Sequence, residues 1–495
     1  MNDTEYVVDE AQIKKAVQNG MALNIITHTL PHDMEVKIER TIGIFLRAAG
    51  QEKLKDYVNY CISELAVNAK KANTKRVYFL EKRLNLANPE DYKTGMMTFK
   101  QDTLDNIAHY LKLQKDNDFY VKINMLYKTD KLLFEVRNNA QISRIELVRI
   151  HERLSRARQY NSMEDAFSQV LDDSEGAGLG LVVMVLMLKK MGLSEDCISV
   201  TGQGNETIAS LSIPLEQAKI NNVTELTKII VDNITTLPQF PRNIITVQQR
   251  ASDPKSDMAD IARFISTDPA MTADMLKLVN SAQYMMAKKV NNIAEAVTII
   301  GIKGIKNLLY SYGTQKLIGD DSPEQKALWE HSYKTAFYAY NLVKNLAQDK
   351  SIIDDVYVGA ILHDMGKIVF SRSTPDIADK VRLFCEERAI PTNTLEDVAA
   401  GMNHAEIGAL LAEKWNFPDI VTAAIRYHHD PLSAPAKYKS LVYAVYLANM
   451  MCLIDDGGIL PGQLESAVLP SFGISKPEQI EMVLKKFREG FEHKR

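Results

Sequence analysis

The pattern of hydrophobic and polar positions changes near Pro214. Before this point, short apolar runs typical of strands alternate with helical stretches, and these runs are Val77–Leu80, Lys131–Val136, Ile198–Thr201 and Ile208–Ile213. After it, nearly every window repeats its apolar residues at helical spacing. We therefore predict an α+β protein, with an N-terminal α/β sandwich followed by an all-helical region.

The same change of pattern predicts the domain boundaries. We expect an N-terminal extension at 1–38, a sandwich domain at 39–215, a linker at 216–224, a helical domain at 225–455 and a C-terminal helical tail at 456–495. A chain of 495 residues is long enough for several domains, at ~100–200 residues each. The tail from Lys476 has the charged, amphipathic pattern of a packing helix.

The composition is that of an ordinary globular protein, with 46% hydrophobic and 25% charged residues. A net charge of −4 predicts no strong attraction to nucleic acid. The four cysteines lack CxxC spacing, which favours reduced thiols. The first residues contain no apolar signal-peptide core, and the longest apolar run, Leu179–Leu188, is too short for a bilayer. We expect a cytoplasmic protein without membrane contact.

The N-terminal region contains three polar or glycine-rich sequence elements. The first is a helix expected from Asp56 to Val77, in which Glu64, Asn68 and Lys71 are spaced to share one face. A Glu and an Asn on one helix face can hold a magnesium ion and orient a water beside a triphosphate. The alternative is a solvated polar face.

The second element is a glycine-rich string at Gly176, Gly178 and Gly180, directly before the apolar helix Val182–Met191. Glycines at a helix start allow a phosphate to approach free backbone N–H groups. The alternative is a turn that packs against the sheet. The third element is Gly202–Thr207, which leads into the strand Ile208–Ile213.

In this order the three elements resemble the GHKL ATPase family, which includes histidine-kinase catalytic domains and anti-sigma-factor kinases. The resemblance covers Glu39–Leu215 and equates the elements with the N box, the second glycine box and the closing strand. It implies an ATP–Mg site, with Glu64 as base and Asn68 as magnesium ligand. The other implied nucleotide-binding residues are Lys71, Gly176, Gly178, Gly180 and Thr207.

The chain departs from that family at the adenine site. The family has a DxGxG string whose Asp recognises the adenine amino group, whereas here Asn138 and Ala140 stand at the Asp and first Gly positions. Asn138 could meet adenine through its carbonyl oxygen, but without the charge that strengthens the bond. His32 precedes an acid as a phosphoacceptor would, yet it lies only 68 − 32 = 36 residues before Asn68. We predict that His32 is an ordinary surface or packing residue.

The helical region contains the string His363-Asp364-Met365-Gly366-Lys367 at the end of an apolar run. Further histidines are His331 upstream and His404, His428 and His429 downstream. Imidazole and carboxylate together can hold a transition metal and activate water on it. The alternatives are helix capping by His363 and Asp364, a surface His428–His429 pair at a helix C-terminus, and a solvated Lys367.

Ordered strings in this region resemble the HDOD family, which is related to HD phosphohydrolases. They span Thr224–Leu453 and are LPQFP, STDPAMTADMLKLVNSAQY, AVTIIGIKGIKNL, WEHS, ILHDMGK, NHAEIGALLAEKW and AIRYHH. The resemblance implies a divalent Fe, Mn or Zn site. His331, His363 and Asp364 would hold the metal, and His404 with one of His428 or His429 would complete a second metal position. Lys367 would contact a substrate phosphate, with Asp364 as the second catalytic residue.

Two departures favour regulation over hydrolysis. Asn449 stands where the HD relatives have a metal-binding Asp, and no Gly-Tyr-Pro string follows Lys367, unlike in the cyclic di-GMP phosphodiesterases. We therefore expect a bacterial signal-transduction regulator that is not an enzyme: an N-terminal module senses a nucleotide or partner, and the helical module engages a downstream protein. Its alternatives are a metal-dependent phosphohydrolase and an ATP-binding kinase of the anti-sigma-factor type. Oligomers are compatible with this prediction.

Overall fold

The chain folds into two units, residues 1–222 and 223–495. The computed structural model describes residues 8–160, 179–220, 225–238, 244–247, 257–280, 290–319, 322–388, 392–477 and 479–492. Gly176 and Gly178 lie outside these residues, as does most of the LPQFP string. Among the described residues, no helix combines the length and hydropathy needed to cross a bilayer.

The first unit contains a five-stranded antiparallel sheet in the order β1-β2-β3-β5-β4. The strands are β1 (Leu23–Thr27), β2 (Val121–Lys128), β3 (Lys131–Asn138), β4 (Ile198–Gln203) and β5 (Glu206–Pro214). Alternation builds the sheet: Leu132, Phe134 and Val136 of β3 are buried, while the residues between them are half-buried. Gly204, with φ +60°, permits the two-residue turn between β4 and β5.

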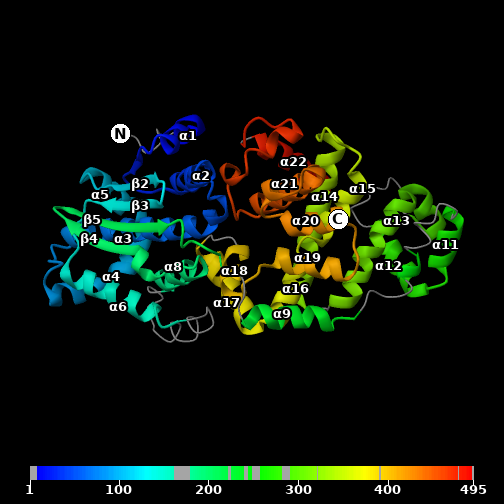
Figure 1. Cartoon of the computed structure of the whole chain (residues 1–495), viewed down its shortest axis with the longest axis horizontal. Coiled ribbons are helices and arrows are strands. Elements are labelled where there is room, and N and C mark those ends of the chain that lie inside the picture. Colours follow the sequence, from blue (N-terminus) through cyan, green and yellow to red (C-terminus); the bar gives the residue numbers. More distant parts are fainter. Residues whose placement is uncertain are drawn as a thin grey trace. The chain divides into compact units, whose positions relative to one another are not determined.

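Helices surround this sheet (Figure 1). They are α1 (Glu10–Gln18), α2 (His32–Ala48), α3 (Lys55–Glu81), α4 (Pro89–Asp105), α5 (Ile107–Asp116), α6 (Arg144–Ala157) and α8 (Leu179–Lys190). Phe45 of α2 packs edge-on against Phe134 of β3, with ring centroids 5.7 Å apart. Helix α8 is apolar nearly all round and packs on α3 and α6.

Two expectations about this unit are wrong. Val77–Leu80 is not a strand, because α3 continues to Glu81 and buries Val77, Tyr78 and Phe79 against the helical segment α4–α5. Residues 1–38 are not an extension, because β1 pairs along the edge of the sheet with β2 and α2 begins at His32. In both cases tertiary packing, which local pattern does not reveal, decides the structure.

The described part of the second unit consists of helices and short 3-10 turns. The helices are α9 (Glu225–Thr236), α11 (Met258–Ser266), α12 (Pro269–Asn280), α13 (Ile293–Ile318), α14 (Pro323–Asn345), α15 (Ile353–Leu362), α16 (Met365–Ser373), α17 (Pro375–Arg388), α18 (Thr392–Ala400), α19 (His404–Lys414), α20 (Asp419–Tyr427), α21 (Lys439–Asp455) and α22 (Gln479–Glu492). One continuous apolar core joins them. Gly301, with φ 73°, divides α13 into two helical segments.

The C-terminal helix α22 belongs to this core rather than to solvent. Ile480, Leu484 and Phe487 are buried on one of its faces, and the Phe487 ring lies 5.8 Å from that of Tyr338 on α14. Asp455 at the end of α21 accepts hydrogen bonds from Tyr338 and Arg488 and pairs with Lys334 at 2.6 Å. The tail from Lys476 is thus the packing helix that its pattern predicts.

An ion-pair cluster joins α3 to α6 in the first unit and makes its stability depend on pH. Arg76 donates to both carboxylate oxygens of Glu146, at 2.8 and 2.6 Å, and Lys75 lies 3.0 Å away. Burial would raise the pKa of Glu146, but Arg76 and Lys75 outweigh it and hold the pKa well below its usual value. Glu146 also closes the capping box of α6 with Ser143.

We expect Glu146→Gln to lower the free energy of unfolding of this unit by about 2 kcal/mol at pH 7, because two cations lose a mostly buried partner. Since the folded pKa is depressed, the native advantage exists above the unfolded value, ~4.3, and disappears as pH falls through the folded pKa. Denaturant unfolding from pH 3 to 7 measures this. Glu152→Gln, an exposed change on the same helix, should have little effect; a pH-independent difference would contradict the ion-pair account.

Candidate metal centre

Side chains from five helices of the second unit converge on one buried point. His331 lies within α14, His363 and Asp364 form the junction between α15 and α16, His404 begins α19, and His428 and His429 directly follow α20. Local sequence places all of these residues except His331 at helix ends. Asn403, for example, accepts hydrogen bonds from the N–H groups of residues 405 and 406, and this cap makes His404 the first helical residue.

The candidate ligands form two overlapping groups. The His331 group contains His331, His363 and Asp364, and the His404 group contains Asp364, His404, His428 and His429. Within each group the ligand atoms lie within 4.8 Å of one another. Asp364 belongs to both groups, and its two carboxylate oxygens face different histidines.

Hydrogen bonds on the outer ring nitrogens fix the state of three imidazoles. His363 Nδ1 lies 2.6 Å from the carbonyl oxygen of Ala360, and His428 Nδ1 lies 2.7 Å from that of Ile425. A carbonyl oxygen only accepts, so each Nδ1 must be the donor. His404 Nδ1 likewise donates to the Glu396 carboxylate at 2.6 Å. In the neutral form, each Nε2 is therefore left with a lone pair.

These lone pairs point at one another and at a carboxylate. His404 Nε2 lies 3.3 Å from His428 Nε2 and 3.2 Å from Asp364 Oδ1. The buried His363 Nε2 and Asp364 Oδ1 have no aligned hydrogen-bond partner. Acceptor atoms that face each other without a donor repel, and a cation between them removes the repulsion. Neutral imidazoles and an ionised carboxylate are also the donor set of Fe, Mn and Zn sites, so the residues fit such an ion.

The electrostatics of the cluster favour a positive charge at its centre. Burial lowers the pKa values of His363, His428 and His331, which keeps them neutral. Burial would raise the pKa of Asp364, but the neighbouring imidazoles and Lys367 outweigh it and hold the carboxylate ionised. Burial would lower the pKa of His404, but the carboxylate of Glu396 outweighs it and raises the pKa. The raised pKa favours an additional proton on the His404 imidazole. A metal ion bound to this imidazole would replace that proton.

Glu396 is the site residue that the sequence analysis missed. Its carboxylate is buried on α18 and accepts from both the backbone N–H and the Nδ1–H of His404, at 2.9 and 2.6 Å. A signal was present: Glu396 shares a helix face with Ala399 and Ala400, both buried. An acidic residue on the apolar face of a helix indicates a paired, functional carboxylate.

Lys367 and Asn449 occupy the His331 side of the cluster. Lys367 Nζ lies 2.7 Å from Asp364 Oδ2, and the lysine side chain is 34% exposed. His331 Nε2 lies 3.1 Å from the side-chain oxygen of Asn449. The alternative of a surface His428–His429 pair is wrong, because His428 is completely buried. His429 Nε2 instead approaches His404 Nε2 at 2.9 Å.

Two glycines bring the site helices into backbone contact. A Cβ atom on Gly366 of α16 would lie 1.9 Å from the carbonyl oxygen of His404, and one on Gly408 of α19 would lie 2.8 Å from Ile425. Gly366 sits inside α16, without a positive φ, and allows α16 and α19 to cross closely enough for Asp364 to meet His404.

Comparisons with known proteins identify the domain that contains this cluster. The HDOD domain model matches residues 237–431. The chain therefore contains an HDOD domain. An uncharacterised protein of Treponema pallidum (strain Nichols) is 40% identical over 492 residues, which cover 99% of this chain and 96% of that protein.

Solved structures similar to this HDOD protein cover about half of it. A candidate phosphohydrolase of Shewanella amazonensis SB2B is 22% identical, with a TM-score of 0.43, over 53% of this chain and 96% of its own. An HDOD domain protein of unknown function from Geobacter sulfurreducens is 21% identical, with a TM-score of 0.43, over 54% and 96%.

In the N-terminal unit, the predicted nucleotide-binding residues lie in two places. Glu64 and Asn68 are adjacent on α3, and Asn68 donates to Glu64 at 3.1 Å, whereas Lys71 is exposed. Gly180, in the first turn of α8, packs directly on Glu64: a Cβ there would lie 2.2 Å from a carboxylate oxygen. The helix expected to bind magnesium thus meets the glycine-rich helix start.

Asn138 and Thr207 lie opposite each other on β3 and β5. Asn138 is buried and donates its amide to Asn73 of α3 at 2.9 Å, while the Thr207 hydroxyl donates to the carbonyl oxygen of Ala140 at 2.6 Å. Both side chains therefore bond within the protein. The Asn138 amide holds α3 against the end of β3, a role that the sequence did not indicate.

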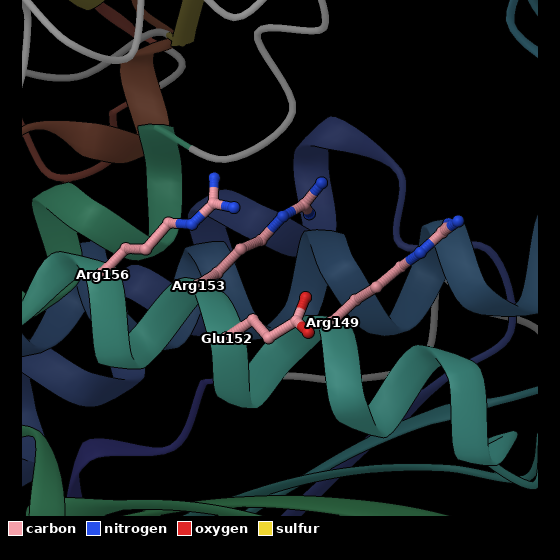
Figure 2. Close-up of a pocket in the computed structure, with 4 residues that line it drawn as sticks. All are labelled: Arg149, Glu152, Arg153 and Arg156. Atoms are coloured by element: carbon pink, nitrogen blue, oxygen red, sulfur yellow. The ribbon is translucent and has the colours of Figure 1, made fainter.

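A basic hollow lies along α6 of the same unit (Figure 2). It measures about 260 Å³ and is lined by Arg149, Glu152, Arg153 and Arg156, whose spacing follows one helix face. The guanidinium of Arg149 lies 4.8 Å from the Tyr92 ring centroid and donates to the Tyr92 hydroxyl at 2.8 Å. This local positive charge contrasts with the net charge of −4 of the chain.

We expect Gly366→Ala to unfold or separate the site helices, because backbone atoms of α19 cannot yield to a Cβ as a flexible side chain can. Overpacking of this kind should lower the free energy of unfolding by about 3 kcal/mol or more. Denaturant unfolding measures the loss. Gly490→Ala on α22, whose nearest atom is 3.5 Å away, is the matched control and should be near neutral. Equal effects of both changes would contradict the close-crossing account.

Proposed function

We propose that this chain is a signal-transduction protein whose HDOD unit holds a divalent transition metal and acts as the output module toward a protein partner. The convergence of acceptor atoms on Asp364, His404 and His428 supports this proposal. A bound ion would supply positive charge and Lewis acidity at this point. The chain's own contribution is to hold the imidazoles in one tautomer and the carboxylate ionised.

Burial of the ligands favours a regulatory role over turnover. The side chains of His363, Asp364, His404 and His428 are at most 1% exposed. Structural metal sites are closed, whereas catalytic sites keep an open position for water or substrate. An ion in this site would join α15, α16, α19 and α20, so metal occupancy would set the relative positions of helices that a partner contacts.

A metal-dependent phosphohydrolase is the second candidate. It is favoured by the rim of the cluster, where Lys367 and His331 have side chains 34% and 20% exposed. An ammonium group there can pair with a phosphate oxygen. Lys367 would have to leave Asp364 Oδ2 to do so, because the two are 2.7 Å apart.

For the N-terminal unit we propose a sensing role of the GHKL type. The contact of Gly180 with Glu64 supports it, since it brings together the two elements that would enclose a triphosphate. Asn68 would then offer its amide oxygen to magnesium, because its amide N–H already bonds Glu64. Because the Asn138 side chain already bonds Asn73, we expect weak nucleotide binding rather than efficient hydrolysis.

The metal proposal predicts about one or two Fe, Mn or Zn ions per chain when the protein is purified without chelator under low oxygen. Asp364→Ala should remove the metal, because this residue belongs to both ligand groups. Asp349→Asn, an exposed change in the same unit, should retain it. Elemental analysis gives the content. Restoring metal to chelated protein at ~100 Kd should stabilise it by about 2.7 kcal/mol.

Metal-free protein that also fails to bind added Fe, Mn or Zn would overturn this proposal. The loaded protein should leave p-nitrophenyl phosphate esters and cyclic dinucleotides intact. Turnover that disappears in Asp364→Asn would instead establish the phosphohydrolase candidate.

The sensing proposal predicts that the unmodified protein binds a fluorescent ATP analogue in the presence of magnesium. Asn68→Ala should abolish the binding, because it removes the magnesium ligand, and Gly180→Val should do so by displacing Glu64. Lys82→Ala, an exposed change near the end of the same helix, is the control. If the unmodified protein does not bind the analogue, the unit senses a partner rather than a nucleotide.

A further inference from the structure

We infer that the cluster holds a single metal ion, in the His404 group, and that Glu396 is the positioning residue that creates this site. The inference rests on the proposed metal centre and adds which ligands are used and how many ions are bound. It follows from the unequal surroundings of the two ligand groups that share Asp364.

The His404 group offers a complete ligand set for one ion. His404, His428, His429 and Asp364 each offer one ligand atom, and these four atoms lie within 4.8 Å of one another. Three nitrogens and one oxygen suit a four-coordinate, tetrahedral site. Carbonyl and carboxylate acceptors fix the outer nitrogens of His428 and His404, so their lone pairs are already directed inward.

In the His331 group, His331 and the Oδ2 atom of Asp364 already have partners without an ion, and only His363 Nε2 lacks an aligned one. Lys367 Nζ holds Asp364 Oδ2 at 2.7 Å, which places a positive charge where a second metal would bind. His331 Nε2 is bonded to the side-chain amide of Asn449 at 3.1 Å. Whichever way that amide is oriented, the nitrogen is occupied: it donates to the oxygen or accepts from the NH₂ group.

The formal charges of the two sides also differ. On the His404 side, Asp364 and Glu396 provide two buried carboxylates for one divalent ion. On the His331 side, the charge of Asp364 is neutralised by Lys367, and Asn449 adds none. Divalent ions prefer the group with the larger negative charge, because burial leaves no water to compensate.

Glu396 would not bind the ion directly, because its carboxylate bonds the outer side of the His404 ring. Its Oε2 atom accepts from both the N–H and the Nδ1–H of His404. These two bonds orient the ring, select the tautomer with a free Nε2 and make that nitrogen more basic. Loss of such a partner typically weakens metal binding by 10–100-fold.

Metal titration of the chelated full-length protein tests the inference, with Zn²⁺ for affinity and Co²⁺ for the visible spectrum of a four-coordinate site. We expect one ion per chain in the unmodified protein and in His363→Ala. His428→Ala should lose the ion, and Glu396→Gln should bind it about 10–100-fold more weakly, with a changed Co²⁺ spectrum. Glu413→Gln, which removes an exposed carboxylate from α19, should behave like the unmodified protein.

A second variant tests whether the His331 group can be made to bind an ion. Lys367→Ala combined with Asn449→Asp removes the competing cation and restores a carboxylate, so it should raise the stoichiometry from one to two. Circular dichroism before titration identifies any variant that has not folded. If the double variant does not fold, the His363→Ala and Glu413→Gln results still test the inference.

Two ions in the unmodified protein, or loss of the ion in His363→Ala with retention in His428→Ala, would overturn the single-site inference and leave the metal proposal intact. Unchanged affinity and spectrum in Glu396→Gln would overturn the role of Glu396. No binding of Zn²⁺ or Co²⁺ by the unmodified protein would overturn both the inference and the proposed metal centre.

Discussion

The helical unit depends on one buried anion, the carboxylate of Asp364. A carboxylate that is 1% exposed is costly to desolvate, and the protein must surround it with positive charge or hydrogen-bond donors. Lys367 meets this need at Oδ2, whereas Oδ1 faces only ring nitrogens of His404 and His428. The asymmetry of one carboxylate therefore explains both why a cation fits the cluster and why the two ligand groups are unequal.

This arrangement is possible only because the helices cross at glycines. Gly366 and Gly408 bring α16 and α19 into backbone contact, and Gly359 of α15 lies against Ala424 of α20 in the same way, with 2.9 Å between its built Cβ and the Ala424 methyl. Any side chain at these positions would push the helix ends apart. The ligands leave from those ends, so a separation of even 1 Å would break a set of donor atoms that lie within 4.8 Å.

The sequence predicted the parts of this protein that depend on local pattern. The helical second unit and three of the five strands, β3, β4 and β5, follow from periodicity. The sequence-based prediction failed where contacts between residues far apart in the chain determine the structure. Val77–Leu80 has strand-like residues, but α4 and α5 offer an apolar surface that keeps it helical. The edge strand β1 is too short and too exposed to show a clear alternation.

The same distinction applies to the candidate site. Residue type and spacing identified the histidines and Asp364, since such residues seldom gather by chance. They did not identify Glu396, whose role arises only when α18 packs beside α19 and brings its carboxylate to His404. Nor could they show that Asn138 bonds Asn73, because that contact joins a strand to a helix 65 residues away.

The first helix of the HDOD unit shows how the metal centre is tied to the rest of that unit. Helix α9 packs on α16, α18 and α19, the helices that contain Lys367, Glu396 and His404. Lys414, at the other end of α19 from His404, donates to three carbonyl oxygens at and beyond the C-terminus of α9, where a cation is favoured by the helix dipole. Thr227 and Asn233 bond α18 and α16 directly. A displacement of α9 would therefore act on the same helices that position the candidate ligands.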